Sequence, residues 1–182
     1  MHQQYVEPTV RVIWDTKEST GVVISESVQD NVFEYTILTA AHCVDIVGSS
    51  CIISLYNKYP MLGIVVKTDT EIDLALVSVT TTVDFCDPVS LAYRDAKIFE
   101  EVVVIGFPIG LGPIYTSGEI SGHDKGLYFL NADVYYGNSG GPVFNEEGDL
   151  TGIVIGVIGD KGRPLFYMGV YVPISVINSF IS

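Results

Sequence analysis

Residues 150–157 read LTGIVIGV, a short apolar run rich in β-branched side chains. The run leads into a turn, Gly159-Asp160-Lys161-Gly162, and a further apolar run, Pro164–Tyr171, follows that turn. Two apolar runs separated by a glycine-rich turn are typical of two β-strands. This stretch therefore predicts β-structure in the C-terminal part of the chain.

The same pattern recurs along the chain in two sets, and each set predicts six short strands. The first set is Thr9–Trp14, Gly21–Ser25, Phe33–Leu38, Cys51–Tyr56, Leu62–Lys67 and Leu74–Val79. The second set is Val102–Ile105, Ile114–Ile120, Leu127–Ala132, Gly141–Phe144, Leu150–Val157 and Pro164–Tyr171. Many short strands with regular turns predict an all-β barrel or sandwich.

Only the segment Pro173–Ile181 has helical spacing, with isoleucines at 174, 177 and 181. The polar stretch Thr80–Leu91 lies between the two sets of strands and predicts the boundary between two units. We place these units at residues 1–87 and 88–182.

Composition excludes several classes of protein. The chain has 182 residues, of which 48% are hydrophobic and 17% charged, and this excludes a disordered protein. No apolar run approaches the roughly 20 residues that span a bilayer, so no membrane partner is expected. The 9 Lys and Arg residues form no patch, and the net charge is −13, so nucleic acid is not expected as a partner.

The N-terminal residues 1–5, MHQQY, lack the basic and apolar regions of a secretory signal. A cytoplasmic location is therefore favoured, and a viral or phage origin is compatible with the small size. The three cysteines, Cys43, Cys51 and Cys86, are expected to be reduced, although a Cys43–Cys51 bridge stays open. No metal-binding spacing is present, and neither a metal nor another cofactor is expected.

The hexapeptide 137–142, GNSGGP, places a serine among glycines. A serine hydroxyl becomes a nucleophile when a base removes its proton and donors stabilise the developing oxyanion. Gly137 can adopt dihedral angles closed to other residues, so its N–H can point to the same place as that of Ser139. The alternative, a simple tight turn, explains the glycines and leaves the serine unexplained.

A histidine and an aspartate supply the rest of such a site. His42 follows an apolar strand in the sequence Thr39-Ala40-Ala41-His42-Cys43, and its ordinary pKa near 6.5 suits a general base. Asp73 directly precedes the apolar run Leu74–Val79 and can accept a hydrogen bond from the second ring nitrogen of His42. Asp69 and Glu71 are nearby alternatives.

The three motifs, in the order His42, Asp73, Ser139, resemble those of the chymotrypsin-like serine peptidases. Within that family, the sequence resembles the HtrA/Deg-type proteases more than it resembles the secreted trypsins. This resemblance is carried by residues 106–112 (GFPIGLG), by Thr116-Ser117-Gly118 and by Val172-Pro173-Ile174.

The resemblance implies two six-stranded Greek-key β-barrels with the site between them and a short C-terminal helix. The first barrel would carry His42 and Asp73, and the second Ser139. It also implies an endopeptidase that forms an acyl-enzyme, with the oxyanion held by the N–H groups of Gly137 and Ser139. Polypeptides would be the substrates, and a homo-oligomer is compatible with the family.

Substrate contacts also follow from the resemblance. The strand containing Ile155, Gly156 and Val157 resembles the one on which the substrate backbone lies. Asp133, six residues before Ser139 (139 − 133 = 6), occupies the position that selects Lys or Arg in trypsins. Two interpretations of Asp133 stay open, a pocket carboxylate and a solvated one. Tyr136 is a candidate for the pocket rim.

Two departures from the family restrict these expectations. Asn138 stands where secreted trypsins have an aspartate that pairs with a new N-terminus, so activation by that route is not expected. The sequence also ends after the predicted helix, where HtrA proteins carry a PDZ domain.

The sequence raises two other functions. One is a latent or inactive protease-fold module that binds extended peptides. The other treats residues 106–112 as a phosphate loop, which is rejected because the Lys-Ser/Thr ending is missing.

Overall fold

The computed structural model describes residues 6–44, 46–55, 59–159 and 168–182. The described part contains twelve strands, two short 3₁₀ helices and one α-helix. In chain order they are β1 Thr9–Trp14, β2 Lys17–Gln29, β3 Val32–Thr39, η1 Ala41–Cys43, β4 Ser50–Leu55, β5 Met61–Asp69, β6 Leu74–Thr81, β7 Glu101–Gly106, η2 Pro108–Gly110, β8 Ile114–Asp124, β9 Leu127–Leu130, β10 Pro142–Phe144, β11 Leu150–Ile158, β12 Met168–Pro173 and α2 Ile174–Ile181.

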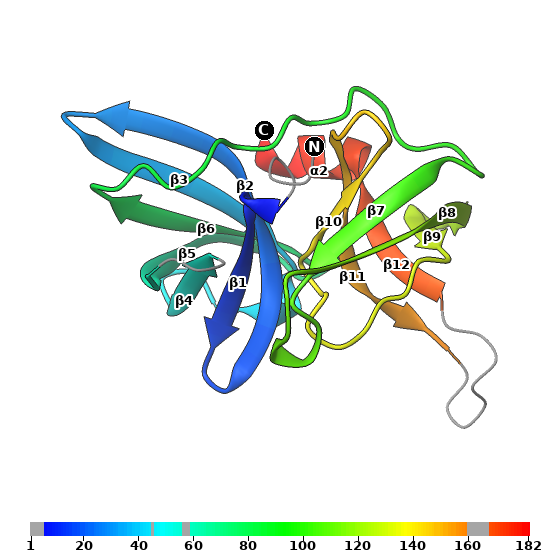
Figure 1. Ribbon diagram of the computed structural model, residues 1–182, viewed down its shortest axis with the longest axis horizontal. Coiled ribbons are helices and arrows are strands. Elements are labelled where there is room, and N and C mark those ends of the chain that lie inside the picture. Colours follow the sequence, from blue (N-terminus) through cyan, green and yellow to red (C-terminus); the bar gives the residue numbers. More distant parts are fainter. Residues whose placement is uncertain (1–5, 45, 56–58, 160–167) are drawn as a thin grey trace.

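The strands form two closed barrels that stand side by side (Figure 1). The first has the strand order β1-β2-β3-β6-β5-β4, and the second has the order β10-β11-β12-β9-β8-β7. Every pairing within the barrels is antiparallel. The prediction of two six-stranded barrels with a short C-terminal helix is confirmed.

Several strands are longer than predicted. β2 runs to Gln29 and β3 begins at Val32, so this hairpin projects beyond the first barrel (Figure 1). The tip of β2 is exposed, and its polar residues show no alternation of buried and exposed positions. Without that alternation the sequence gives no signal for the outer part of the strand. Of the predicted strand Pro164–Tyr171, residues 164–167 lie outside the described residues.

Three apolar clusters stabilise this arrangement. One fills the first barrel and includes Ile37, Ile53 and Val77, and another fills the second barrel. The third lies between the barrels, because it joins Val22 and Leu38 of the first to residues of the second and to α2. Burying each large aliphatic side chain contributes roughly 1.5–3 kcal/mol, so the contact between the barrels is itself a stabilising core.

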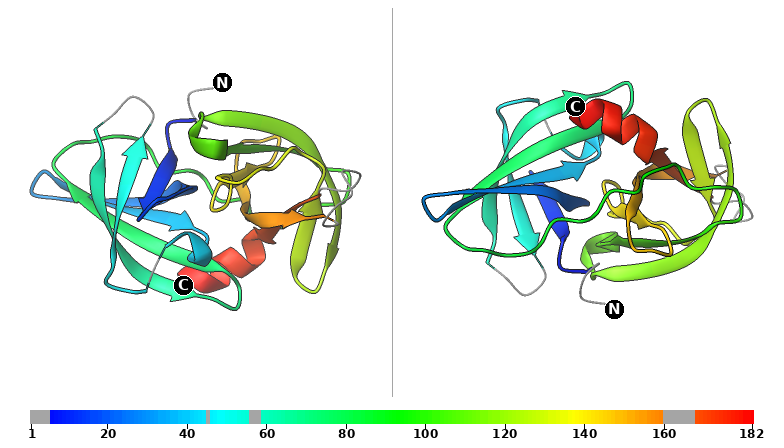
Figure 2. Two further views of the ribbon diagram at one scale, coloured as in Figure 1. Left: turned by 90° about the horizontal axis from the view of Figure 1, so that it is seen from below. Right: turned by 90° about the horizontal axis from the view of Figure 1, so that it is seen from above.

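The helix α2 returns from the second barrel to the first, and the C-terminus lies beside the first barrel (Figure 2). Asp95 holds the start of the helix, since its carboxylate accepts hydrogen bonds from the backbone N–H and the hydroxyl of Ser175, both at 2.8 Å. At the other end Lys67 of β5 donates to the Phe180 carbonyl and stacks on the Phe180 ring. The helix therefore bridges the two barrels.

The segment between the barrels also crosses from one to the other. Val89 N–H donates to Val23 of the first barrel at 3.0 Å, whereas Ser90 and Ala92 bond to Leu150 of the second. No helix in the described residues has the length and apolar character that a bilayer crossing requires.

Candidate active site

His42 lies in the short 3₁₀ helix η1, immediately after β3. The neighbouring Ala41 and Cys43 are buried, while the His42 side chain is about half exposed, at 49%. The Ala41 N–H donates to the carbonyl of Asp73 at 3.1 Å, so the backbone itself fixes η1 next to the start of β6.

Asp73 contacts His42 through both carboxylate oxygens. His42 Nδ1 lies 2.7 Å from Oδ2, and the His42 backbone N–H donates to Oδ1 at 2.9 Å. Asp73 has a φ of +58°, a left-handed conformation that aspartate tolerates better than most residues. The alternative carboxylate, Asp69, accepts from the N–H groups of Glu71 and Ile72 and so closes the turn between β5 and β6.

The pairing changes the acid–base behaviour of His42. The hydrogen bond to Asp73 raises the pKa of His42 to about 10, with a further contribution from Cys43 and against partial burial, which lowers it. Because Nδ1 is engaged by Asp73, Nε2 is the ring nitrogen left to exchange a proton with another group.

Ser139 lies in the loop between β9 and β10. Backbone hydrogen bonds fix this loop to strands of both barrels. Gly140 N–H donates to Val154 of β11 at 2.7 Å, and the Ser139 carbonyl accepts from Thr20 of β2 at 2.9 Å. Gly140 has a φ of +82°, and a Cβ there would lie 2.0 Å from the Thr20 carbonyl oxygen. Only glycine fits this close approach of the loop to the first barrel.

The same contacts bring Ser139 next to the His42 segment. The Ser139 carbonyl lies 3.6 Å from Cys43 Sγ, and a Cβ on Gly140 would meet Thr39 and Ala40. Within the described part of the chain the Ser139 hydroxyl makes no hydrogen bond, to His42 or to any other residue. Catalytic hydrogen bonds are often long in a protein without substrate.

Two backbone N–H groups beside Ser139 are unpaired. Gly137 N–H and Ser139 N–H donate to no acceptor among the described residues. The Tyr136 carbonyl accepts from Ile109 N–H of η2 at 2.8 Å. Since C=O and N–H point in opposite directions in a trans peptide, Gly137 N–H is directed away from η2. The Gly137 φ of +100° makes this peptide orientation accessible to glycine alone.

The predicted substrate strand has a free edge. β10 pairs with β11 only as far as Ile153, and Val154 bonds to Gly140 and Gly141 of the Ser139 loop. From Ile155 onward β11 has no strand partner on that side among the described residues. A bulge lies between Val154 and Gly156, at Ile155, and a Cβ on Gly156 would point into open space. Val157 is 41% exposed. An unpaired edge of this kind can accept an extended peptide as an added strand.

Asp133 and Tyr136 both lie in the loop that leads to Ser139. The Asp133 carbonyl accepts from the Thr116 hydroxyl at 2.8 Å, and its side chain is exposed. Tyr136 is 89% exposed and can contact a bound molecule.

A hollow next to His42 was not anticipated from the sequence. It lies between η1 and the turn before Asp73, and it is lined by Ala41, His42, Val44, Ile46, Thr68, Thr70 and Asp73. Thr68 at the end of β5 and Thr70 in the following turn are polar and belong to no motif, so their nearness to His42 follows only from the fold.

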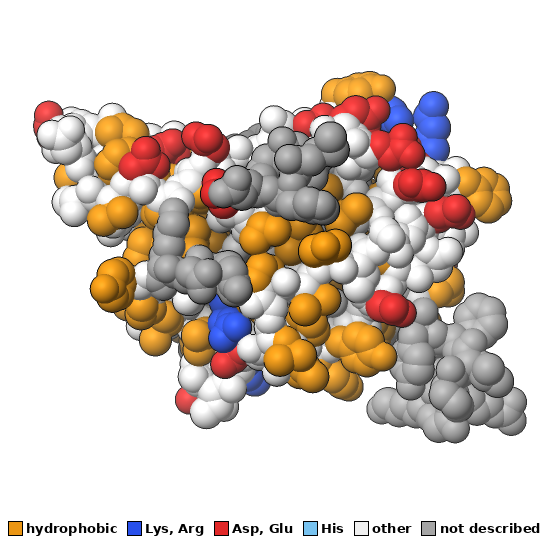
Figure 3. Space-filling view, viewed as in Figure 1, with side chains coloured by type: hydrophobic (Ala, Val, Ile, Leu, Met, Phe, Trp, Pro, Cys, Tyr) orange, Lys and Arg blue, Asp and Glu red, His pale blue; other side chains and the backbone are white. Residues whose placement is uncertain are grey.

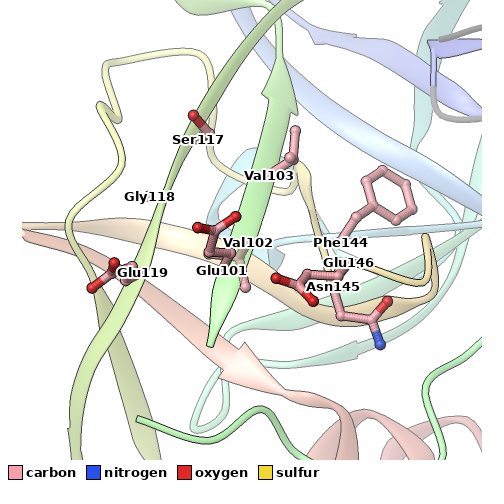
Figure 4. A pocket seen from close by; sticks show the side chains of 9 residues that line it. All are labelled: Glu101, Val102, Val103, Ser117, Gly118, Glu119, Phe144, Asn145 and Glu146. Carbon is pink, nitrogen blue, oxygen red and sulfur yellow. The ribbon is translucent and has the colours of Figure 1, made fainter. Parts of the chain in front are cut away.

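A second hollow lies on the outer surface of the second barrel, between β7, β8 and the end of β10 (Figure 4). Its rim carries the carboxylates of Glu101, Glu119 and Glu146, and it contains none of the site residues described above. No group of three or more metal-ligating side chains is assembled anywhere in the described ranges. The three cysteines are buried, and no disulfide bond joins them.

Two antiparallel six-stranded barrels with a His–Asp pair and a glycine-flanked serine at their junction define a chymotrypsin-like serine peptidase fold. A family model described as a trypsin-like peptidase domain matches residues 19–153. The chain belongs to this family.

The curated relatives are serine proteases. The chain is 32% identical over 168 residues to a probable periplasmic serine endoprotease, DegP-like, of Halomonas elongata, which covers 86% of this chain and 33% of the relative. It is 30% identical over 166 residues to the serine protease Rv3671c of Mycobacterium tuberculosis, covering 83% of this chain and 39% of the relative. The chain thus spans about a third of the length of these relatives.

A solved structure shares the fold. The serine endoprotease from Yersinia pestis superposes with a TM-score of 0.79 at 23% identity, covering 98% of this chain and 63% of that one.

The expectation of a cytoplasmic location is wrong. Several curated relatives, including the one from Halomonas elongata, are named periplasmic serine proteases, and these names point to a periplasmic or secreted location. The N-terminal residues on which the expectation rested lie outside the described part of the chain.

Proposed function

We propose that this chain is a serine endopeptidase in which Ser139 is the nucleophile, His42 the general base and Asp73 the group that orients His42. The observation that carries the proposal is the two-point contact between His42 and Asp73 at the junction that also holds Ser139. This contact fixes the tautomer in which Nε2 faces away from Asp73 and is free to accept a proton.

The reaction follows from these groups. Ser139 Oγ attacks the carbonyl carbon of the scissile peptide bond, and His42 Nε2 takes the hydroxyl proton. The unpaired N–H groups of Gly137 and Ser139 stabilise the oxyanion that forms. His42 then gives its proton to the leaving amine, and an acyl-enzyme remains. His42 then takes a proton from water, whose oxygen attacks the acyl carbon, and passes this proton to Ser139 Oγ as the ester bond breaks.

We propose polypeptide substrates that add as a strand to the free edge at Ile155, Gly156 and Val157. Strand addition supplies main-chain hydrogen bonds without regard to side chains, so specificity comes from pockets. Tyr136 is exposed in the loop that leads to Ser139. We propose that it forms the rim of the pocket for the residue before the scissile bond.

A preference for Lys or Arg at that residue is the finer part of the proposal. Asp133 lies in the loop leading to Ser139, and an accessible carboxylate attracts a basic side chain. The net charge of −13 favours cationic substrates in general. On one face of the molecule, acidic side chains gather along the upper edge (Figure 3).

The test is cleavage of a mixed peptide library by the wild-type chain and by Ser139→Ala, read by mass spectrometry. Cleavage by the wild type alone supports the endopeptidase, and the residue before the cut reports specificity. Cleavage after small aliphatic residues keeps the mechanism and rejects the role of Asp133.

The second candidate is a latent or inactive module that binds extended peptides. It is favoured by the lack of a hydrogen bond between Ser139 and His42 in the described residues, together with the free edge of β11. A serine-reactive fluorophosphonate separates the two candidates. Labelling that Ser139→Ala abolishes supports the enzyme, and peptide binding without labelling supports the module.

A further inference from the structure

Thr20 of β2 is a completely buried polar residue, and it contacts the Ser139 loop although it belongs to the first barrel. Its hydroxyl donates to the Gly137 carbonyl at 2.6 Å, and the same oxygen accepts from Phe107 N–H at 3.0 Å. Its backbone N–H donates to the Ser139 carbonyl at 2.9 Å. One residue of the first barrel therefore holds the loop at two carbonyls, on either side of Asn138.

These contacts leave the Thr20 side chain no freedom. Its carbonyl accepts from the Thr39 hydroxyl at 2.7 Å, which fixes the strand. Glycines surround the hydroxyl and methyl groups, since a Cβ on Gly106 would lie 3.1 Å from Thr20 Oγ1 and one on Gly141 3.3 Å from Thr20 Cγ2. A hydroxyl confined in this way has one orientation in which it both donates to Gly137 and accepts from Phe107.

The bond to the Gly137 carbonyl has a consequence for the oxyanion donors. The two peptide groups that flank Gly137 are fixed separately. Ile109 holds the first at the Tyr136 carbonyl. Thr20 holds the second at the Gly137 carbonyl, and the Asn138 N–H of this second peptide donates to the Tyr135 carbonyl at 3.0 Å. Together they define the φ and ψ of Gly137, whose φ of +100° is the one that directs its N–H away from η2. Glycine alone does not hold this conformation, because it moves freely between many.

We propose that the Thr20 hydroxyl is a positioning group that holds the Gly137–Ser139 loop in the conformation able to stabilise an oxyanion. This inference rests on the proposed endopeptidase function. The hydroxyl never touches substrate. It acts through the peptide between Gly137 and Asn138, which links the two donors. Without the hydroxyl the Gly137 carbonyl loses its partner, and this peptide can rotate and change the direction of the two donors relative to each other.

The test compares Thr20→Val, which keeps the shape and removes the hydroxyl, with Thr20→Ser, which keeps the hydroxyl. Ser19→Ala is the control, because Ser19 is the adjacent buried hydroxyl and bonds instead to the Val12 carbonyl of β1. We expect Thr20→Val to lower kcat by about 10- to 100-fold, somewhat less than the loss of a whole oxyanion donor, with KM little changed. Thr20→Ser and Ser19→Ala are expected to stay near wild type.

A peptide boronate and an uncleaved peptide distinguish positioning from a general structural effect. The boronate forms a tetrahedral adduct with Ser139, so Thr20→Val should weaken its binding by a factor similar to the loss in kcat. The uncleaved peptide, bound to Ser139→Ala with and without Thr20→Val, should bind equally well. If Thr20→Val does not fold, Thr20→Ser against Thr20→Ala gives the same comparison.

A crystal structure of the Thr20→Val chain provides a readout that does not need activity. Rotation of the Gly137–Asn138 peptide supports the inference, even if the wild-type chain proves to be inactive in the library experiment. An unchanged Gly137–Asn138 peptide overturns it, as does a kcat within about twofold of wild type. A wild type that cleaves nothing contradicts the proposed function instead.

Discussion

The His42 ring and the His42 backbone bind the two oxygens of one carboxylate, that of Asp73, at 2.7 and 2.9 Å. The carboxylate therefore fixes both the side chain and the main chain of His42. A single-point contact would let the ring turn about its Cβ, whereas two contacts define where Nε2 points.

We expect Asp73→Asn to lower kcat/KM by about 10⁴-fold, since an amide at this position favours the wrong tautomer of His42. Peptide cleavage by the purified variant measures this loss. Asp69→Asn is the control, because Asp69 caps the neighbouring turn and does not contact His42. An equal loss of activity in both variants would contradict the assignment of Asp73.

The pH dependence follows from the raised pKa of His42. In the proposed mechanism only neutral His42 can accept the Ser139 proton, and the hydrogen bond to Asp73 raises the pKa of His42 to about 10. We therefore expect kcat/KM to increase with pH from neutrality to about 10, and Asp73→Asn to move this limb toward the ordinary value of 6.5. Initial rates of peptide cleavage between pH 6.5 and about pH 10 measure both expected limbs. A plateau already reached at pH 7 in the wild type is the opposing outcome.

The same bond makes stability depend on pH. His42 has a higher pKa folded than unfolded, so its contribution is complete below pH 6.5 and is lost as the pH rises through about 10. Urea unfolding across this range should therefore show a wild-type advantage over Asp73→Asn that shrinks at alkaline pH. An advantage that grows with pH would have the wrong sign.

Gly137→Ala tests the oxyanion loop. A Cβ at this position would lie 2.4 Å from the Phe107 carbonyl, and the φ of +100° is strained for alanine. We expect a loss of kcat/KM of about 10²-fold or more, because the Gly137 N–H must move. Gly126→Ala is the matched control, with a φ of +81° and nothing within 4 Å of the new Cβ. It should lower stability by about 1 kcal/mol and leave activity intact.

Asp133→Asn tests specificity. If Asp133 binds the basic side chain, cleavage after Lys and Arg should fall by about 10- to 100-fold, the value of a hydrogen bond to a charged group. Asp124→Asn removes the same charge from an exposed strand end and serves as the control. Competing peptides that differ only at the residue before the cut measure the ratio. Equal effects of both variants would indicate that overall charge, and not Asp133, sets the preference.

Ile177→Ala tests the bridge made by α2. Ile177 is completely buried in the cluster between the barrels, and we expect its truncation to lower the free energy of unfolding by about 2–5 kcal/mol. Asn178→Ala, on the exposed side of the same helix, should change it by no more than about 0.5 kcal/mol. Urea denaturation measures both. A small effect at Ile177 would mean that the helix adds little to the contact between the barrels.

The sequence predicted the barrel strands well where one face of a strand is buried. In β3 the buried Tyr35 lies between the exposed Glu34 and the half-buried Thr36, and this alternation is a direct consequence of burial on one face. The prediction from alternation failed in the outer part of β2, where no side chain on either face is buried. The prediction of a cytoplasmic location was wrong, because it rested on residues 1–5 alone, whereas several relatives are named periplasmic proteases.

At the site, the motifs around His42 and Ser139 are local and could be recognised from the sequence. The choice of Asp73 over Asp69 depended on its position directly before a buried strand, and the contact to His42 follows from that position. Nothing in the sequence indicated that Thr20 contacts the Ser139 loop. It lies 117 positions from Gly137, and in the sequence it is an ordinary strand residue.

Thr20 belongs to the first barrel but holds the Ser139 loop of the second. This contact restricts how the chain can be recombined with its relatives. A chimaera that takes one barrel from each of two parents keeps both interior cores, and it can fold normally where the parents also match in the apolar cluster between the barrels. It nevertheless places a foreign residue opposite the Gly137 carbonyl unless the two parents agree at position 20. Such hybrids would be correctly folded, but residue 20 would not suit the Ser139 loop that it must hold. The first repair to attempt is to place at position 20 the residue of the parent that supplied the second barrel.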